Sequence, residues 1–179
     1  MSNILLCLMV SPKVTNNLSQ FVLESIKTWM WTRSDTTLTS PPDDRSYGTL
    51  RLFRDKTKRV IAAHITIQSP SSDWASSHLL CYRSDGSLEA SGDQLAAFGM
   101  PHGGGLFTRE KTYDAQGKSP NDTLCRLRYD GEDTEPTEYP CDSPDFNLGN
   151  FASTRVDRIN HLMFSNVGQL ASLLAKHNH

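Results

Sequence analysis

Apolar and polar residues alternate with a period of two along most of the segment from Thr49 to Tyr129. The alternation is interrupted by short polar stretches that contain Asp or Gly, at residues 55–58, 84–87 and 114–117. A period of two places alternate side chains on opposite faces of a strand, and such polar stretches are typical of tight hairpin turns. The pattern therefore predicts an antiparallel β meander of about five to six strands, joined by three hairpins.

Two other segments show the three- and four-residue spacing of an amphipathic helix. Residues 17–33 place apolar side chains on one helical stripe, and the first residues of the segment fit a capping box. Near the C-terminus, residues 167–176 predict a short closing helix, with Ser165 or Asn166 as its N-cap. These patterns predict an α+β fold with an N-terminal amphipathic helix, the meander, a long acidic loop and a short C-terminal helix. We expect both helices to cover one face of the sheet.

The length of the chain sets the domain organisation. A chain of 179 residues can bury its own core, so residues 1–179 are expected to form a single domain. Residues 130–150 are rich in Asp, Glu and Pro, which predicts an irregular acidic loop. Residues 1–16 contain a seven-residue apolar run that fits either a buried first strand or a degenerate signal segment. An exported (periplasmic) protein and a cytoplasmic one therefore both remain open.

The charge distribution argues against a nucleic-acid partner. The net charge is -2, which gives no general attraction to a polyanion. Residues 45–59 hold six basic residues, but strand alternation divides them between two faces, and the acidic loop would repel a polyanion nearby. No run approaches the roughly 20 apolar residues needed to cross a bilayer, so no membrane insertion is expected.

The four cysteines form no C-x-x-C pair, so a zinc site is not expected. They fit either buried thiols or one disulfide. A bridge between Cys125 and Cys141 is the pairing that the sequence favours, because these residues flank the acidic loop and a bond between them would fix it.

The stretch GMPHGGGLF at residues 99–107 contains the one motif with a known chemical use. His102-Gly103-Gly104-Gly105 resembles the oxyanion-hole motif of lipases and esterases in the α/β-hydrolase family. That family also requires a G-x-S-x-G motif, which does not occur in this chain. We therefore interpret residues 99–105 as a loop between hairpins, in which His102, Gly103 and Gly104 are candidates for close backbone approach to a ligand or partner.

Three further residues are weak binding candidates. His64 lies on the strand face opposite to the predicted core, and Trp29 and Trp31 end the predicted first helix, where one of them would be exposed as a partner anchor. The histidines lack the spacing of metal ligands. No catalytic residues, metal site or cofactor are predicted.

Two classes of function follow from these features. The first is a non-catalytic binding or inhibitory module that acts through a sheet face or the 99–105 loop. The alternative is a small enzyme or ligand-binding protein with a pocket between the first helix and the sheet, lined by His64 or His102. The partner is accordingly a protein or a small ligand, and the sequence does not specify an oligomeric state.

Overall fold

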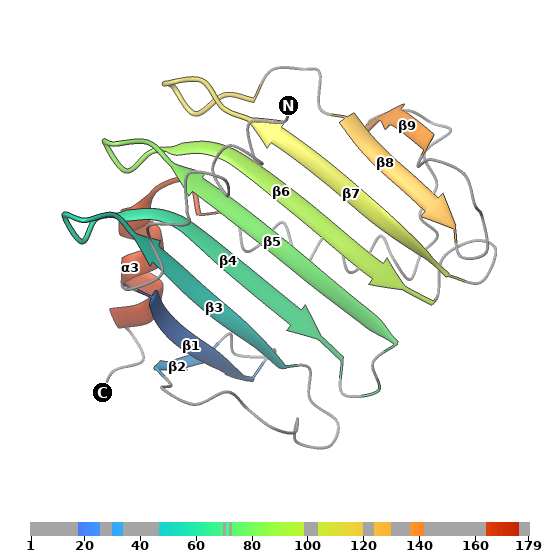
Figure 1. The fold of residues 1–179 in the computed structure, drawn as a ribbon, viewed down its shortest axis with the longest axis horizontal. Coiled ribbons are helices and arrows are strands. Elements are labelled where there is room, and N and C mark those ends of the chain that lie inside the picture. The colour runs from blue at the N-terminus through green and yellow to red at the C-terminus, as the bar shows by residue number, and fades with distance from the viewer. Residues whose placement is uncertain are drawn as a thin grey trace.

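The described part of the chain is built around one antiparallel sheet (Figure 1). The computed structural model describes residues 18–25, 30–33, 47–69, 71, 73–98, 104–119, 124–129, 137–141 and 164–175. Nine strands form the sheet in the order β2-β1-β3-β4-β5-β6-β7-β8-β9, and every neighbouring pair is antiparallel. Their bounds are β1 Leu18–Ser25, β2 Met30–Arg33, β3 Tyr47–Arg54, β4 Val60–Gln68, β5 Trp74–Tyr82, β6 Leu88–Ala97, β7 Gly105–Thr112, β8 Leu124–Tyr129 and β9 Thr137–Pro140.

The predicted meander over residues 49–129 is confirmed as strands β3 to β8. The three predicted hairpins connect β3 with β4, β5 with β6 and β7 with β8, and Figure 1 shows them projecting from the same end of the sheet. Each turn contains an Asp whose carboxylate accepts backbone N–H groups two or four residues further on. The acceptors are Asp55, Asp85 and Asp114. The turn chemistry is local, which is why the sequence located the hairpins.

The hairpin between β3 and β4 contains one non-glycine residue in a strained, left-handed backbone conformation. Lys58 has a φ of 65°, whereas the matching positions of the other two turns are Gly86 and Gly117 with φ values of 84° and 78°. A left-handed conformation is costly for a residue with a Cβ atom. We expect Lys58→Gly to raise the free energy of unfolding by about 0.5–1 kcal/mol, because the relief of strain exceeds the added entropy of the unfolded chain. Urea unfolding measures this. Lys56→Gly in the same turn is the control, and it should lower stability.

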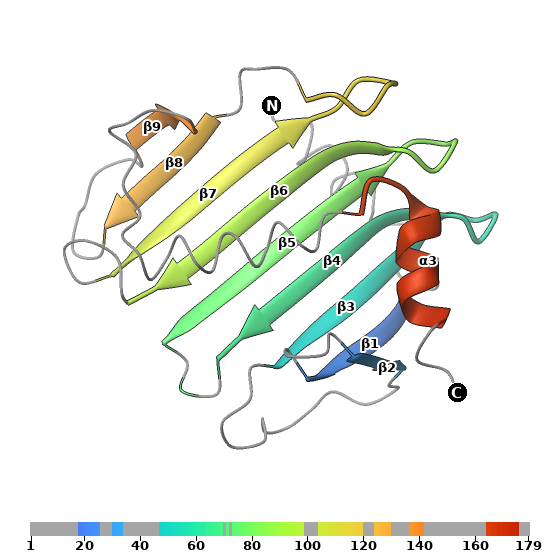
Figure 2. The same ribbon diagram turned by 180° about the vertical axis from the view of Figure 1, so that it is seen from behind.

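One face of the sheet forms the hydrophobic core, which we call the core face. Its largest fully buried apolar side chains come from five neighbouring strands: Leu50, Ile65, Leu80, Leu95 and Phe107. Helix α3 (Val167–Ala175) packs against this face through Leu170, which is 1% exposed (Figure 2). The predicted C-terminal helix is thus confirmed, and Asn166 caps it by accepting the N–H of Gln169 at 3.0 Å. No helix in the described ranges is long and apolar enough to cross a membrane.

The helix predicted over residues 17–33 is wrong in the ranges that the structure describes. Residues 18–25 form β1 and residues 30–33 form β2, and β1 pairs with β3 so that Phe21 lies opposite Leu50. The apolar positions of a short segment fit a helical and an extended period nearly equally well. As a strand, the segment pairs with the edge of β3 and satisfies its backbone hydrogen-bonding groups there. This long-range pairing outweighs the weak local preference for a helix that the apolar spacing indicated.

The acidic loop predicted at residues 130–150 also needs correction. Residues 137–140 form β9, which pairs with β8 in the register Arg126 to Glu138. The opposite charges of Arg126 and Glu138 favour this register. The high content of acidic residues in the segment led to the prediction of a loop instead of a strand. Part of the acidic segment is therefore a sheet edge strand.

Candidate functional site

The face of the sheet opposite α3, which we call the pocket face, carries polar side chains in register. Thr49, Thr66, Ser77, Gln94, Thr108 and Arg126 are successive partners on strands β3 to β8, and we call them the polar row. Each alternates along its strand with a residue of the core face, as the period of two requires. Because neighbouring strands lie about 4.8 Å apart, the row is a repeating line of hydrogen-bonding groups.

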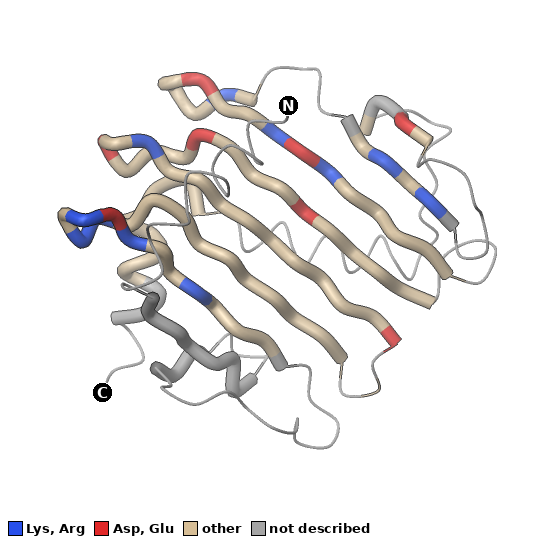
Figure 3. The backbone as a smooth tube through the Cα atoms, in the orientation of Figure 1, with Lys and Arg blue, Asp and Glu red and all other residues tan. Residues whose placement is uncertain are grey.

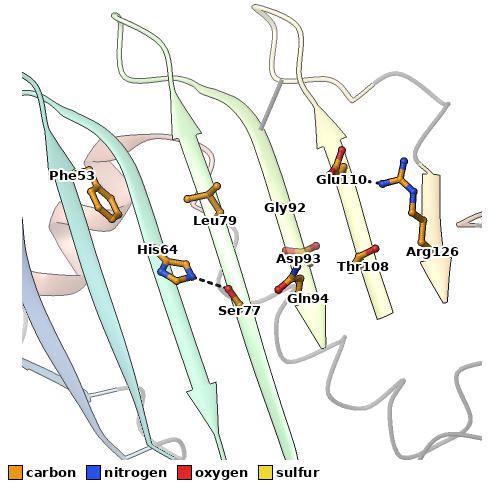
Figure 4. Close-up of a pocket in the computed structure, with 10 residues that line it drawn as sticks. All are labelled: Phe53, His64, Ser77, Leu79, Gly92, Asp93, Gln94, Thr108, Glu110 and Arg126. Atoms are coloured by element: carbon orange, nitrogen blue, oxygen red, sulfur yellow. Dashed lines mark hydrogen bonds and ion pairs between the residues drawn. The ribbon is translucent and has the colours of Figure 1, made fainter. Parts of the chain in front are cut away.

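A pocket with a volume of about 400 Å³ opens over this row (Figure 4). Two of the described lining residues, Phe53 and Leu79, supply large apolar side chains. Six of the others supply hydroxyl, amide, imidazole or charged side chains: His64, Ser77, Gln94, Thr108, Glu110 and Arg126. Gly92 and Asp93 also line the pocket, but the carboxylate of Asp93 points to the other side of the sheet. The lining comes from strands β3 to β8, so rigid sheet backbone positions all of these residues.

The middle of the pocket is uncharged. Nε2 of His64 and Oγ of Ser77 are hydrogen-bonded at 2.7 Å between strands β4 and β5 (Figure 4). Burial, followed by the positive charge of Arg51 and by His78, lowers the pKa of His64 below its ordinary value. The imidazole is therefore neutral at pH 7, and the pair offers an uncharged donor and acceptor to whatever enters the pocket.

The β7–β8 side of the pocket contains charges of both signs, and Figure 3 shows basic and acidic positions on β7 and basic positions on β8. Nε of Arg126 donates to Oε1 of Glu138 at 2.6 Å, and Nη1 of Arg126 lies 3.9 Å from Oε1 of Glu110. The hydrogen bond to Glu138, with the charges of both carboxylates, raises the pKa of Arg126. The guanidinium is thus already compensated by neighbouring carboxylates, and it is not a spare cation for an anionic ligand.

A buried ionic cluster lies on the other side of the same strands. On the core face, the carboxylate of Asp93 accepts from Nε of Arg109 at 2.7 Å, contacts its Nη2 at 2.6 Å, and accepts from Nδ1 of His78. Burial alone would raise the pKa of Asp93, but its two partners lower it below the ordinary value. Among the described residues, no partner reaches the buried Nε2 of His78.

This cluster supports the pocket from beneath. Its members lie on β5, β6 and β7, each one position away along the strand from a residue of the polar row: Ser77, Gln94 and Thr108. Charge-assisted hydrogen bonds across three strands fix the register that lines up the pocket floor. The side chains of the cluster point to the core, so their role at the pocket is positional.

The structure places the sequence-predicted site residues in different situations. His64 lines the pocket, and Gly104 is buried immediately before β7. Trp31 lies on β2 opposite Leu23 in register, although its side chain is outside the described part. His102, Gly103 and Trp29 lie outside the described residues.

The cysteine pair that the sequence favoured is bonded in the structure. Cys125 and Cys141 form a disulfide with a Cα–Cα distance of 5.0 Å. Cys81 is also disulfide-bonded. The Cys125 side chain is buried in the core, and the bond ties the residue after β9 to the second residue of β8.

Sequence reasoning missed most of the pocket. Ser77, Gln94 and Thr108 are ordinary polar residues of predicted strands, and only the register of two strand pairings brings them into one line. His78 and Asp93 gave a weak signal, because each occupies a position that alternation assigns to the core.

Comparison of the chain with protein families, with curated proteins and with solved structures finds no match. Within the described ranges, no group of three or more His, Cys, Asp or Glu residues is arranged to hold a metal ion.

Proposed function

We propose that this protein is a binding module that takes a small molecule into the pocket on its sheet face. The observation that carries the proposal is the pocket itself, with about 400 Å³ of space and a lining of convergent polar groups beside two apolar side chains. Ligand sites typically have volumes of about 300–1,000 Å³ and combine apolar walls with a few positioned polar groups. Of the two binding surfaces that the sequence suggested, a sheet face and the 99–105 loop, the proposal therefore uses the sheet face.

Binding is favoured over chemistry by the electrostatics of His64. A serine beside a histidine could act as nucleophile and base, but the base must become a cation when it takes the proton. Burial and the neighbouring Arg51 both disfavour that cation, as the lowered pKa of His64 shows. Ser77 and His64 are therefore better suited to hydrogen-bonding a ligand than to activating a nucleophile.

Filling the pocket tests the proposal. Thr108→Trp should abolish the binding of fragments that the unmodified protein binds, because an indole on the pocket floor occupies the ligand space. Thr112→Trp is the matched control, since Thr112 lies on the same strand and the same face but does not line the pocket. Ligand-observed NMR with a fragment library measures both. Binding that survives in the Thr108→Trp variant, or a library in which nothing binds, would overturn the proposal.

A further inference from the structure

We propose that the ligand of this pocket is a neutral, polyhydroxylated compound of the size of a mono- or disaccharide. The inference rests on the proposed function and adds the chemical class of the ligand. It depends on the charge, the hydrogen-bonding groups and the shape of the described lining.

Charge excludes the common ionic ligands. The two charged side chains that face the pocket, Glu110 and Arg126, have opposite signs and approach to 3.9 Å. Glu138 holds the same guanidinium at 2.6 Å. An anionic ligand would have to displace these carboxylates, and a cationic one would have to compete with Arg126 for them. A ligand with no net charge avoids the desolvation cost of either exchange.

The hydrogen-bonding groups match a hydroxyl-rich compound. Ser77, Gln94 and Thr108 are consecutive partners across β5, β6 and β7, and each side chain can both donate and accept. The hydroxyl groups of a sugar also both donate and accept, so any orientation of a hydroxyl over the row finds a partner. The strand spacing of about 4.8 Å is comparable with the width of a sugar ring.

The apolar part of the pocket is small and one-sided. Among the described lining residues, Phe53 and Leu79 carry the large apolar side chains, and Figure 4 shows both on the β3–β5 side, away from Glu110 and Arg126. Such a wall can receive the C–H face of a sugar ring, whereas an acyl chain would also have to cover the polar row without hydrogen bonds. The volume of about 400 Å³ is at the small end of the range for ligand sites and suits one or two rings.

A panel of sugars tests the ligand class. Glucose, galactose, maltose and cellobiose are titrated against the full chain by saturation-transfer NMR and calorimetry, with glucuronate and glucosamine as charged counterparts. We expect saturable binding of at least one neutral sugar, and weaker binding of both charged ones. Gln94→Ala should weaken the binding of that neutral sugar about tenfold, the effect of losing one or two hydrogen bonds to the ligand. Gln68→Ala is the control, because Gln68 is partly exposed on the same face and outside the pocket lining.

The outcomes separate the two proposals. If a charged sugar binds as tightly as the neutral ones, the ligand class is wrong. If Gln68→Ala and Gln94→Ala weaken binding equally, the sugar does not bind over the polar row, and the inference is wrong for this pocket. If no sugar binds while fragments bind in a manner that Thr108→Trp abolishes, the ligand class is wrong and the pocket remains a binding site. If neither sugars nor fragments bind, both proposals fail.

Discussion

Asp93→Asn is expected to lower the free energy of unfolding by about 3–5 kcal/mol, the cost of removing one partner from a buried ion pair. Asp93 is 2% exposed and is the carboxylate that Arg109 and His78 share. An amide at this position carries no charge, so the buried guanidinium of Arg109 would lose the carboxylate that now accepts its hydrogen bond. Few other single substitutions in the described sheet should cost as much.

Urea unfolding followed by circular dichroism measures this loss. Glu89→Gln is the matched control, because Glu89 lies on the same strand, is exposed and also loses one charge. The control should change stability by less than about 0.5 kcal/mol, as surface substitutions usually do. Equal effects of the two substitutions would show that the cluster does not hold the sheet together. If Asp93→Asn does not fold, Arg109→Met tests the same cluster while keeping the aliphatic part of the side chain.

The pH dependence gives an independent check. The pKa of Asp93 is lowered in the folded protein from its ordinary value of 3.8, since His78 and Arg109 outweigh the opposing effect of burial. A lowered folded pKa means that the carboxylate stabilises the protein fully above the unfolded pKa. That contribution is lost as the pH falls through the lower folded pKa. The stability difference between the unmodified protein and Asp93→Asn should therefore shrink as the pH falls below about 4. A difference that grows on acidification would contradict this assignment.

The sequence predicted the parts of the fold that depend on local chemistry. The hairpins are such parts, because Asp55, Asp85 and Asp114 make their decisive hydrogen bonds within four residues along the chain. The alternation in β4 likewise predicted that Ile65 is buried and that His64 is on the opposite face. Strand β1 was mistaken for a helix because its apolar spacing is ambiguous and its partner, β3, is more than twenty residues away.

The candidate site depends on long-range register, which a single sequence does not contain. Thr108 meets Gln94 only after β6 and β7 have paired, and a slip of one residue would place it on the core face. The ionic cluster is subject to the same limit, since the three side chains come from three strands. One long-range contact could be predicted from the sequence, the disulfide between Cys125 and Cys141. These two residues flank an acidic, proline-rich segment that has few apolar side chains to hold it in place.

Replacing both Cys125 and Cys141 by Ala is expected to lower the free energy of unfolding by about 3 kcal/mol, the chain-entropy value for a loop of this length. The two residues are 16 positions apart, so the bond restricts a loop of moderate size in the unfolded chain. Alanine is the suitable replacement because Cys125 is 1% exposed, and a serine hydroxyl there would add the cost of a buried polar group. Substitution is preferable to a reductant because Cys81 is also disulfide-bonded and would be reduced as well.

Loss of this bond should act first on β9. This strand has four residues, pairs with β8, and is otherwise held by the exposed ion pair between Arg126 and Glu138, a kind of contact worth about 0–1 kcal/mol. In the double variant, hydrogen exchange at the amides of β9 should therefore accelerate more than the loss of global stability explains. The amides of β4 and β5 should accelerate only by the amount that corresponds to the lower free energy of unfolding. Release of β9 would also leave Arg126 without Glu138 and nearer to Glu110, which changes the charged side of the pocket. Uniform acceleration across the whole sheet would instead show that the disulfide stabilises the fold only through the unfolded chain.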